Sequence, residues 1–243
     1  MRYLLTIAYD GTNYRGWQKQ IDELTIQQTI EEVLSQVLNT EIIIHGSGRT
    51  DAGVHAYAQH AHFDVKKQVD VDKLKYSLNS LLPNDIVITN IKQVADDFHA
   101  RFSAKKKLYE YVIINGERSP FMRDHALFIK TPLDVKVLKE NIIKFRGIHN
   151  FKNFTTKPDD ENDYVREIYF TDVYKQGDVI RLQFIGEGFM RSQIRLMVGA
   201  LLAIALNKLP ADYIDLNLNT EAQRKTISEK APARGLYLLG VDY

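Results

Sequence analysis

The chain of 243 residues contains no cysteine, which removes several classes of chemistry. Disulfides, thiolate metal sites and thiol nucleophiles are all excluded. A long hydrophobic run is missing too: the longest, from Met197 to Leu206, is half of the roughly 20 residues that a membrane-spanning helix needs. The apolar start stops at Asp10, so no secretory signal peptide is expected. We therefore expect a soluble protein of the cytoplasm.

An excess of charge of one sign is also missing, because 32 Lys and Arg face 31 Asp and Glu and the net charge is +1. Domains that bind nucleic acid with a strong electrostatic footprint are clearly basic. Any RNA-binding surface must therefore be a local patch. Short basic runs of this kind are equally typical of solvated faces; the candidates are Arg15 with Lys19, Lys66-Lys67, and Arg101 with residues 105–107.

The chain is 44% hydrophobic and 26% charged, as is usual for a globular protein. Its length suits one large domain or two small ones. Hydrophobic periodicity predicts alternating strands and helices. The strands are expected at residues 3–9, 41–45, 56–65, 85–94, 107–115, 165–174, 179–185 and 235–243, and the helices at 26–38, 71–83, 138–147 and 189–206. This order predicts an α+β fold of two split-βαβ (ferredoxin-like) halves, residues 1–105 and 106–243, with a shared, mainly antiparallel sheet.

A glycine-rich run from Gly46 to Ala56 holds the first candidate for chemistry. Its three glycines let the backbone come close to a ligand. Asp51 lies within this frame, and Arg49 stands two residues before it, where a cation helps to keep a carboxylate ionised. An ordinary β-turn with a solvated Arg-x-Asp ion pair explains the same residues.

Two further candidates lie in the second half. Alternation on the strand at 107–115 puts Tyr109 and Tyr111 on one face. Tyr109 there is suited to stack on a flipped base or to pack in a core. Arg191 and Arg195 are four apart in the predicted last helix and are expected on one face of it. Because the predicted helix is so apolar, the two arginine side chains need either polar partners within the protein or access to water.

The histidines and the N-terminal loop raise two more possibilities. His60 and His62 share one face of a predicted strand, with His55 nearby, and such pairs can bind a metal. Because no third acidic or thiol ligand has a convincing spacing, we predict no metal and expect His55 to support the Asp51 loop. The loop from Tyr14 to Gln20 suits RNA stacking, although Trp17 is equally suited to a core position.

These motifs resemble those of the TruA family of tRNA pseudouridine synthases. The run Gly48-Arg49-Thr50-Asp51-Ala52-Gly53-Val54-His55 is similar to the family's active-site motif. The resemblance implies that Asp51 is catalytic, that Arg49 helps to extrude the target base, and that Tyr109 lies beside the uracil. It also implies that Arg195, six residues after a phenylalanine, pairs with the aspartate. Many members carry Met-Val before this arginine where the present chain has Gln193-Ile194, and Arg191 is the competing candidate.

Other family-like segments follow in family order, at residues 10–18, 97–104, 147–151, 166–168 and 231–238. The resemblance implies a homodimer that converts uridine to pseudouridine at positions 38, 39 and 40 of the tRNA anticodon arm, with no cofactor. A paralogous synthase with another RNA target and a non-catalytic RNA-binding module are the alternatives. An Asp-nucleophile phosphotransferase ranks lowest, since no second carboxylate closely follows Asp51.

Overall fold

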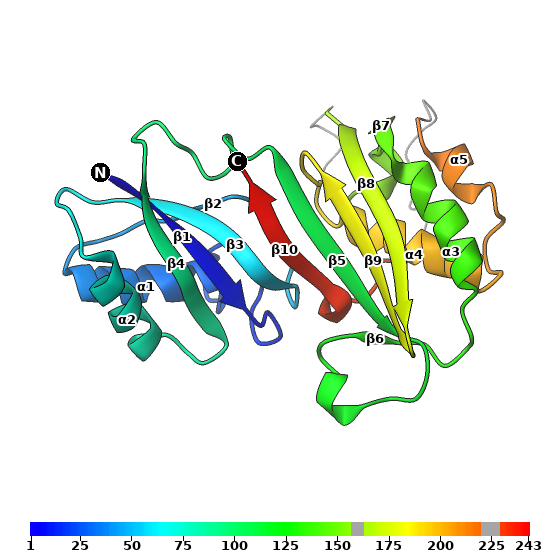
Figure 1. The fold of residues 1–243 in the computed structure, drawn as a ribbon, viewed down its shortest axis with the longest axis horizontal. Coiled ribbons are helices and arrows are strands. Elements are labelled where there is room, and N and C mark those ends of the chain that lie inside the picture. The colour runs from blue at the N-terminus through cyan, green and yellow to red at the C-terminus, as the bar shows by residue number, and fades with distance from the viewer. Residues whose placement is uncertain (157–162, 220–228) are drawn as a thin grey trace. The chain divides into compact units, whose positions relative to one another are not determined.

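The computed structural model describes residues 1–156, 163–219 and 229–243, which divide into two compact units (Figure 1). Unit 1 contains residues 1–105 and 237–243, and unit 2 contains residues 106–236. The chain thus passes to unit 2 after residue 105 and returns to unit 1 for its last seven residues. No helix within the described residues is long and apolar enough to cross a membrane.

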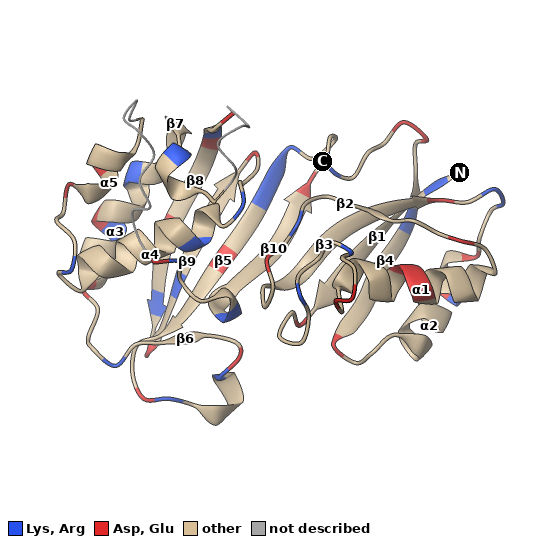
Figure 2. Ribbon diagram, turned by 180° about the vertical axis from the view of Figure 1, so that it is seen from behind, with Lys and Arg blue, Asp and Glu red and all other residues tan. Residues whose placement is uncertain are grey.

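Unit 1 has the connectivity of a split-βαβ unit. Its elements are β1 (Arg2–Tyr9), α1 (Ile26–Leu38), β2 (His45–Gly46), β3 (His55–Asp64), α2 (Val71–Leu81) and β4 (Ile86–Val94). Antiparallel pairing gives the order β4-β1-β3, with β2 also on β3. The final strand, β10 (Leu236–Asp242), pairs in parallel with β3. Helices α1 and α2 cover one face of this sheet (Figure 2).

Unit 2 repeats this pattern with additions. Its elements are β5 (Lys106–Ile114), β6 (Leu127–Phe128), α3 (Val135–Ile142), β7 (Gly147–Asn150), β8 (Val165–Gln176), β9 (Val179–Gly186), α4 (Gln193–Ala205) and α5 (Tyr213–Asn217), with short 3-10 helices at Pro120–Met122, Ile143–Phe145, Lys152–Phe154 and Ala233–Gly235. Strands run in the antiparallel order β5-β9-β8-β7, and β6 lies parallel to β5. The predicted α+β class with mainly antiparallel pairing is confirmed.

Polar residues at the helix ends explain where the helices start and stop. The Thr25 hydroxyl accepts a hydrogen bond from Gln28 N at 3.4 Å, and α1 ends at Asn39 in the left-handed region. Asp70 and Asp134 cap α2 and α3 by accepting backbone N–H groups of the first turn. Such caps satisfy amides that have no partner inside the helix.

The strand predicted at residues 41–45 is wrong for most of its length, since only His45 and Gly46 pair with β3. Side chains of α1 take the hydrogen bonds that a neighbouring strand would make. Ile42 N donates to Ser35 Oγ at 2.9 Å, and Ile44 N donates to Glu31 Oε1 at 3.1 Å. The apolar run is therefore an extended segment fastened to a helix.

Candidate active site

The loop between β2 and β3 carries Asp51 and is fixed from within by hydrogen bonds. The buried Ser47 hydroxyl donates to Gln59 Oε1 at 2.7 Å, and Gln59 Nε2 donates to Gly48 O at 3.0 Å. Val54 N donates to Asp51 O at 3.2 Å, which closes a β-turn. Gly53, the third residue of this turn, has a φ of +77°, a conformation that favours glycine. The backbone at Asp51 is thus a turn whose position is set by its surroundings.

The N-terminal loop, residues 10–18, packs backbone against backbone on the Asp51 loop. Trp17 N donates to Thr50 O at 3.1 Å. A Cβ added at Gly16 would lie 2.6 Å from Thr50 O, and one added at Gly11 would lie 2.1 Å from Val54 O. Only glycine permits so close an approach. The two loops therefore form one support for Asp51.

Aromatic side chains of this N-terminal loop point into the protein. Trp17 is only 2% exposed and packs where a Cβ on Gly46 would be 2.5 Å from its Nε1. The buried Tyr14 donates its hydroxyl hydrogen to Asp85 Oδ1 at 2.6 Å. Trp17 therefore occupies the core, which was one of its two expected positions. Neither the Trp17 ring nor the Tyr14 ring is exposed enough to stack on RNA.

A row of polar side chains positions Arg49. Its Nε donates to Gln18 Oε1 at 3.1 Å, Gln18 Nε2 donates to Gln27 Oε1 at 2.9 Å, and Gln27 Nε2 donates to Glu31 Oε1 at 2.9 Å. Gln27 and Glu31 are buried on α1. Sequence reasoning missed this row, although Gln27 and Glu31 are four apart beside the apolar stripe of the helix. The partner of the Arg49 Nε–H is thus a neutral amide.

The histidines of β3 contact other segments of unit 1. His55 is buried with its Nδ1 3.0 Å from Asp10 Oδ1, so it contacts the N-terminal loop that supports Asp51. His62 Nδ1 accepts a hydrogen bond from Ala100 N at 3.1 Å. Burial lowers the pKa of both His60 and His62 to about 4. A neutral ring that accepts at Nδ1 carries its proton on Nε2, so His62 offers no lone pair to a metal.

Tyr109 of unit 2 lies on β5 opposite Phe184 of β9. Tyr109 is 8% exposed, and its ring packs edge-on against that of Phe189, with 5.4 Å between the ring centroids. Tyr111, two residues on, donates its hydroxyl hydrogen to Pro232 O at 2.8 Å, and burial raises the pKa of its phenol. The Tyr109 ring is thus held in position by its contact with Phe189.

The helix predicted from Phe189 starts four residues later, at Gln193. Ser192 has a φ of +59°, so the backbone turns before the helix begins. The prediction that Arg191 and Arg195 share a helix face is wrong, because Arg191 precedes the helix and is exposed.

Arg195 lies in the first turn of α4 and is tied to the segment before β10. Its Nε donates to Ala231 O at 2.8 Å, and Ala231 N donates to Arg195 O at 3.0 Å. The neighbouring residue, Pro232, accepts the Tyr111 hydroxyl. In unit 2, β5 with Tyr109 and α4 with Arg195 thus both bind the segment at residues 231–232, while Arg49 and Asp51 share one loop of unit 1.

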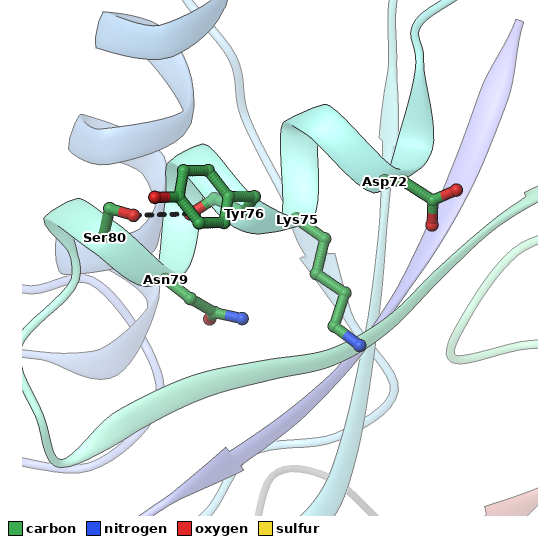
Figure 3. Close-up of a pocket in the computed structure, with 5 residues that line it drawn as sticks. All are labelled: Asp72, Lys75, Tyr76, Asn79 and Ser80. Carbon is green, nitrogen blue, oxygen red and sulfur yellow. Dashed lines mark hydrogen bonds between the residues drawn. The ribbon is translucent and has the colours of Figure 1, made fainter.

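A hollow beside α2 contains none of the four candidate site residues (Figure 3). It is lined by five residues of that one helix: Asp72, Lys75, Tyr76, Asn79 and Ser80. Figure 3 shows a single hydrogen bond among them, from Ser80 Oγ to Tyr76 O. We regard this hollow as ordinary helix surface.

Comparison with known proteins identifies what the chain resembles. A family model described as tRNA pseudouridine synthase matches residues 5–103 and 142–243. The protein named tRNA pseudouridine synthase A from Ruminiclostridium cellulolyticum is 39% identical over 98% of both chains. Its namesake from Streptococcus mutans is 40% identical, covering 100% of this chain and 99% of its own. The tRNA pseudouridine synthase A 2 of Bacillus cereus is 41% identical over 99% of both chains.

Proposed function

This chain belongs to the tRNA pseudouridine synthase family, and on that premise we propose that it isomerises uridine to pseudouridine at positions 38, 39 and 40 in the anticodon stem-loop of tRNA. The observation that carries the proposal is similarity along the whole chain, at 39–41% identity to proteins with that name. The supported loop around Asp51 gives the reaction a candidate site.

The isomerisation needs neither an oxidant nor an imported group. The bond from ribose C1′ to base N1 breaks, the uracil rotates while it is held, and its C5 bonds to C1′. The C5 hydrogen leaves as a proton and N1 gains one, so substrate and product have the same composition. We therefore propose that the enzyme works without a cofactor.

We propose that Asp51 supplies the carboxylate for this reaction, as a nucleophile at C1′ or C6 or as a base. Two loops and Gln59 fix the backbone around it, which orients the side chain before substrate binds. An ionised carboxylate in a dry site needs a cation or hydrogen-bond donors. Arg195 is the proposed cation, because its guanidinium stays charged and binds carboxylates in a fork.

Tyr109 and Arg49 are the proposed substrate-binding groups. The ring of Tyr109 stacks beside the target uracil, and its hydroxyl is available as a donor or proton relay. Arg49 takes the place of the extruded base, which offsets part of the few kcal/mol that base flipping costs. In this proposal residues 1–105 supply Asp51 and residues 106–243 complete the site.

The proposed setting is a cytoplasmic homodimer in which tRNA contacts both subunits. Family membership supports this proposal. Sedimentation with and without tRNA tests the stoichiometry, and a monomer in the complex would refute the dimer.

The direct test is a map of pseudouridines in an unmodified tRNA transcript before and after treatment with the purified protein. We expect new pseudouridine at positions 38, 39 and 40 wherever the transcript has uridine there. New pseudouridine only in other RNAs would favour a paralogue with a different target. Tight binding without any conversion would favour a non-catalytic RNA-binding protein.

A further inference from the structure

The segment between β4 and β5 (Figure 1) contains a loop, fixed by hydrogen bonds, that carries a solvent-exposed aromatic side chain. This loop, residues 98–103, lies wholly in unit 1. Phe102 is 75% exposed, and the guanidinium carbon of Arg101, also exposed, lies 5.6 Å from the centre of its ring. An exposed cation stacked on an exposed ring has the chemistry of a site for a base and its phosphate.

All six backbone N–H groups of the 98–103 loop have partners inside unit 1. Ala100 N donates to His62 Nδ1 at 3.1 Å. Arg101 N and Phe102 N both donate to His99 Nδ1, at 3.1 and 3.3 Å. The other three, of residues 98, 99 and 103, donate to Ala95 O, Ser103 Oγ and His99 O. Because these hydrogen bonds already fix the loop backbone, a ligand that binds there loses little free energy to the ordering of the loop.

Two carbonyls and a series of rings complete the support. Arg2 Nη1 donates to Phe98 O at 2.6 Å, and the Tyr243 hydroxyl donates to Ala100 O at 3.1 Å. The His99 ring packs between those of His62 and Phe102, with centroid distances of 4.7 and 4.3 Å. Phe102 thus has protein on one side of it and solvent over most of its surface.

We propose that Phe102 stacks on a nucleobase of the bound tRNA and that Arg101 binds a neighbouring phosphate. This inference rests on the proposed function, because family membership supplies the RNA. Stacking on an aromatic side chain tolerates any base, since every base has a π-face. Arginine suits the phosphate because its planar fork matches the phosphate oxygens.

Within unit 1 the 98–103 loop lies beside one end of β3, and Asp51 lies near the other. It contacts His62 near the end of β3, whereas the Asp51 loop runs into the start of that strand at His55. From His55 to His62, seven residues of strand span about 23 Å at roughly 3.3 Å per residue. The contact therefore adds to the affinity for tRNA and leaves the chemical step at the target uridine unchanged.

The charges around the loop restrict where the phosphate binds. Exposed Asp96 and Asp97 precede it, and the N-terminal amine lies 3.7 Å from Asp96 Oδ1. Exposed Lys105 follows it. Arg101 and Lys105 are thus exposed cations within the loop and just after it, and each can bind one phosphate.

The test compares Phe102→Ala, Phe102→Tyr and Arg101→Gln with a matched pair on α2. Lys75 and Tyr76 repeat the order of a cation before an exposed aromatic, and Tyr76 is 77% exposed (Figure 3). Lys75→Gln and Tyr76→Ala are therefore the controls. Filter binding of full-length protein to unmodified tRNA measures the dissociation constant from 50 to 200 mM salt. Single-turnover conversion at saturating protein measures the chemical step.

We expect Phe102→Ala to weaken tRNA binding about 5- to 140-fold, and Phe102→Tyr to keep most of the wild-type affinity. The logarithm of the association constant falls as the logarithm of the salt concentration rises. Arg101→Gln should make this slope less steep by about 0.7 to 0.9, the contribution of one phosphate contact. Phe102→Ala should leave that slope unchanged. Both variants should keep the wild-type rate at saturation, and both controls should bind as the wild type does.

Several outcomes overturn the proposal. One is binding within twofold of wild type for both Phe102→Ala and Arg101→Gln; another is an equal loss in the α2 controls. A third is that Phe102→Ala dissociates a dimer of the protein but leaves the affinity of each subunit for tRNA unchanged. The Phe102 ring would then pack against a second copy of the chain and not against RNA. If Phe102→Ala does not fold, Phe102→Trp replaces it, and unchanged fluorescence on adding tRNA refutes the stack. Wild-type protein that neither binds nor converts tRNA refutes the proposed function instead.

Discussion

Gly16→Ala is the substitution through which the support of Asp51 is best tested. Gly16 has a φ of +96°, and a Cβ there would be 2.6 Å from Thr50 O, the carbonyl just before Asp51. Reaching an ordinary contact of 3.4 Å requires the two loops to separate by about 0.8 Å. Positive φ costs alanine about 1–2 kcal/mol. Loss of the Trp17 N–Thr50 O hydrogen bond adds about 1 kcal/mol.

We therefore expect Gly16→Ala to lower the free energy of unfolding by roughly 2–3 kcal/mol. A displacement near 1 Å at a catalytic group slows a reaction about 100-fold, so the single-turnover rate should fall by a factor of that order. Affinity for tRNA should change little. Urea unfolding, single-turnover conversion and filter binding measure the three quantities separately.

The control is Gly177→Ala in the turn between β8 and β9. Gly177 has a φ of +58°, but an added Cβ there meets no heavy atom of the described residues within 4 Å. This variant shares the backbone strain without the crowding, so it should lose stability and keep its rate. A Gly16→Ala enzyme that is folded and as fast as Gly177→Ala would refute the supporting role of the N-terminal loop.

Three further results are expected. Arg195→Met should reduce turnover more than Arg191→Met, with activity falling at low pH and partly recovering as pH rises, because an unpaired carboxylate takes up a proton more readily; equal effects without pH dependence would remove Arg195 from its role. His60→Phe should keep the ring contact with Tyr243 and remove a buried Nδ1 that has no hydrogen-bond partner among the described residues. Between about pH 6.5 and 4, the unfolded wild-type protein takes up a proton at His60 that the folded protein does not, so acid destabilises the wild type. The variant lacks this group, and urea unfolding should show that it loses less stability than the wild type over this pH range, by on the order of 2 kcal/mol. An identical pH profile for the two proteins would contradict this. EDTA, with spermidine present to keep the tRNA folded, should leave activity unchanged, and a loss that only zinc restores would revive a histidine metal site.

Local patterns were sufficient for most of the fold. Periodicity placed α1, α2 and the long strands because each has one apolar face, and Thr25 marked the start of α1. The strand at 41–45 failed because Ser35 and Glu31, side chains of the preceding helix α1, accept its backbone hydrogen bonds, and an apolar pattern does not reveal such pairings. The start of α4 failed because the apolar Phe189 and Met190 extend the hydrophobic pattern of the helix toward its N-terminus, whereas Ser192 turns the backbone.

The candidate site shows the same division. Asp51, Arg49, Tyr109 and Arg195 were found by motif, since each belongs to a run with a recognisable order. The groups that position them were not, because Gln18, Gln27 and Gln59 act through pairings that no spacing in one loop reveals. Close approach of backbones at Gly11 and Gly16 likewise requires coordinates.

The central claim is that the Asp51 carboxylate carries the isomerisation. Its most direct test is tritium release to water from tRNA labelled at uridine C5, under single-turnover conditions, by wild-type protein and by Asp51→Asn. We predict that wild type releases tritium up to the number of uridines at positions 38, 39 and 40, with neither ATP nor a redox cofactor. The variant should bind tRNA with nearly unchanged affinity, since phosphate contacts supply most of it, and release none. An Asp51→Asn protein that keeps a tenth of the wild-type rate would contradict the claim.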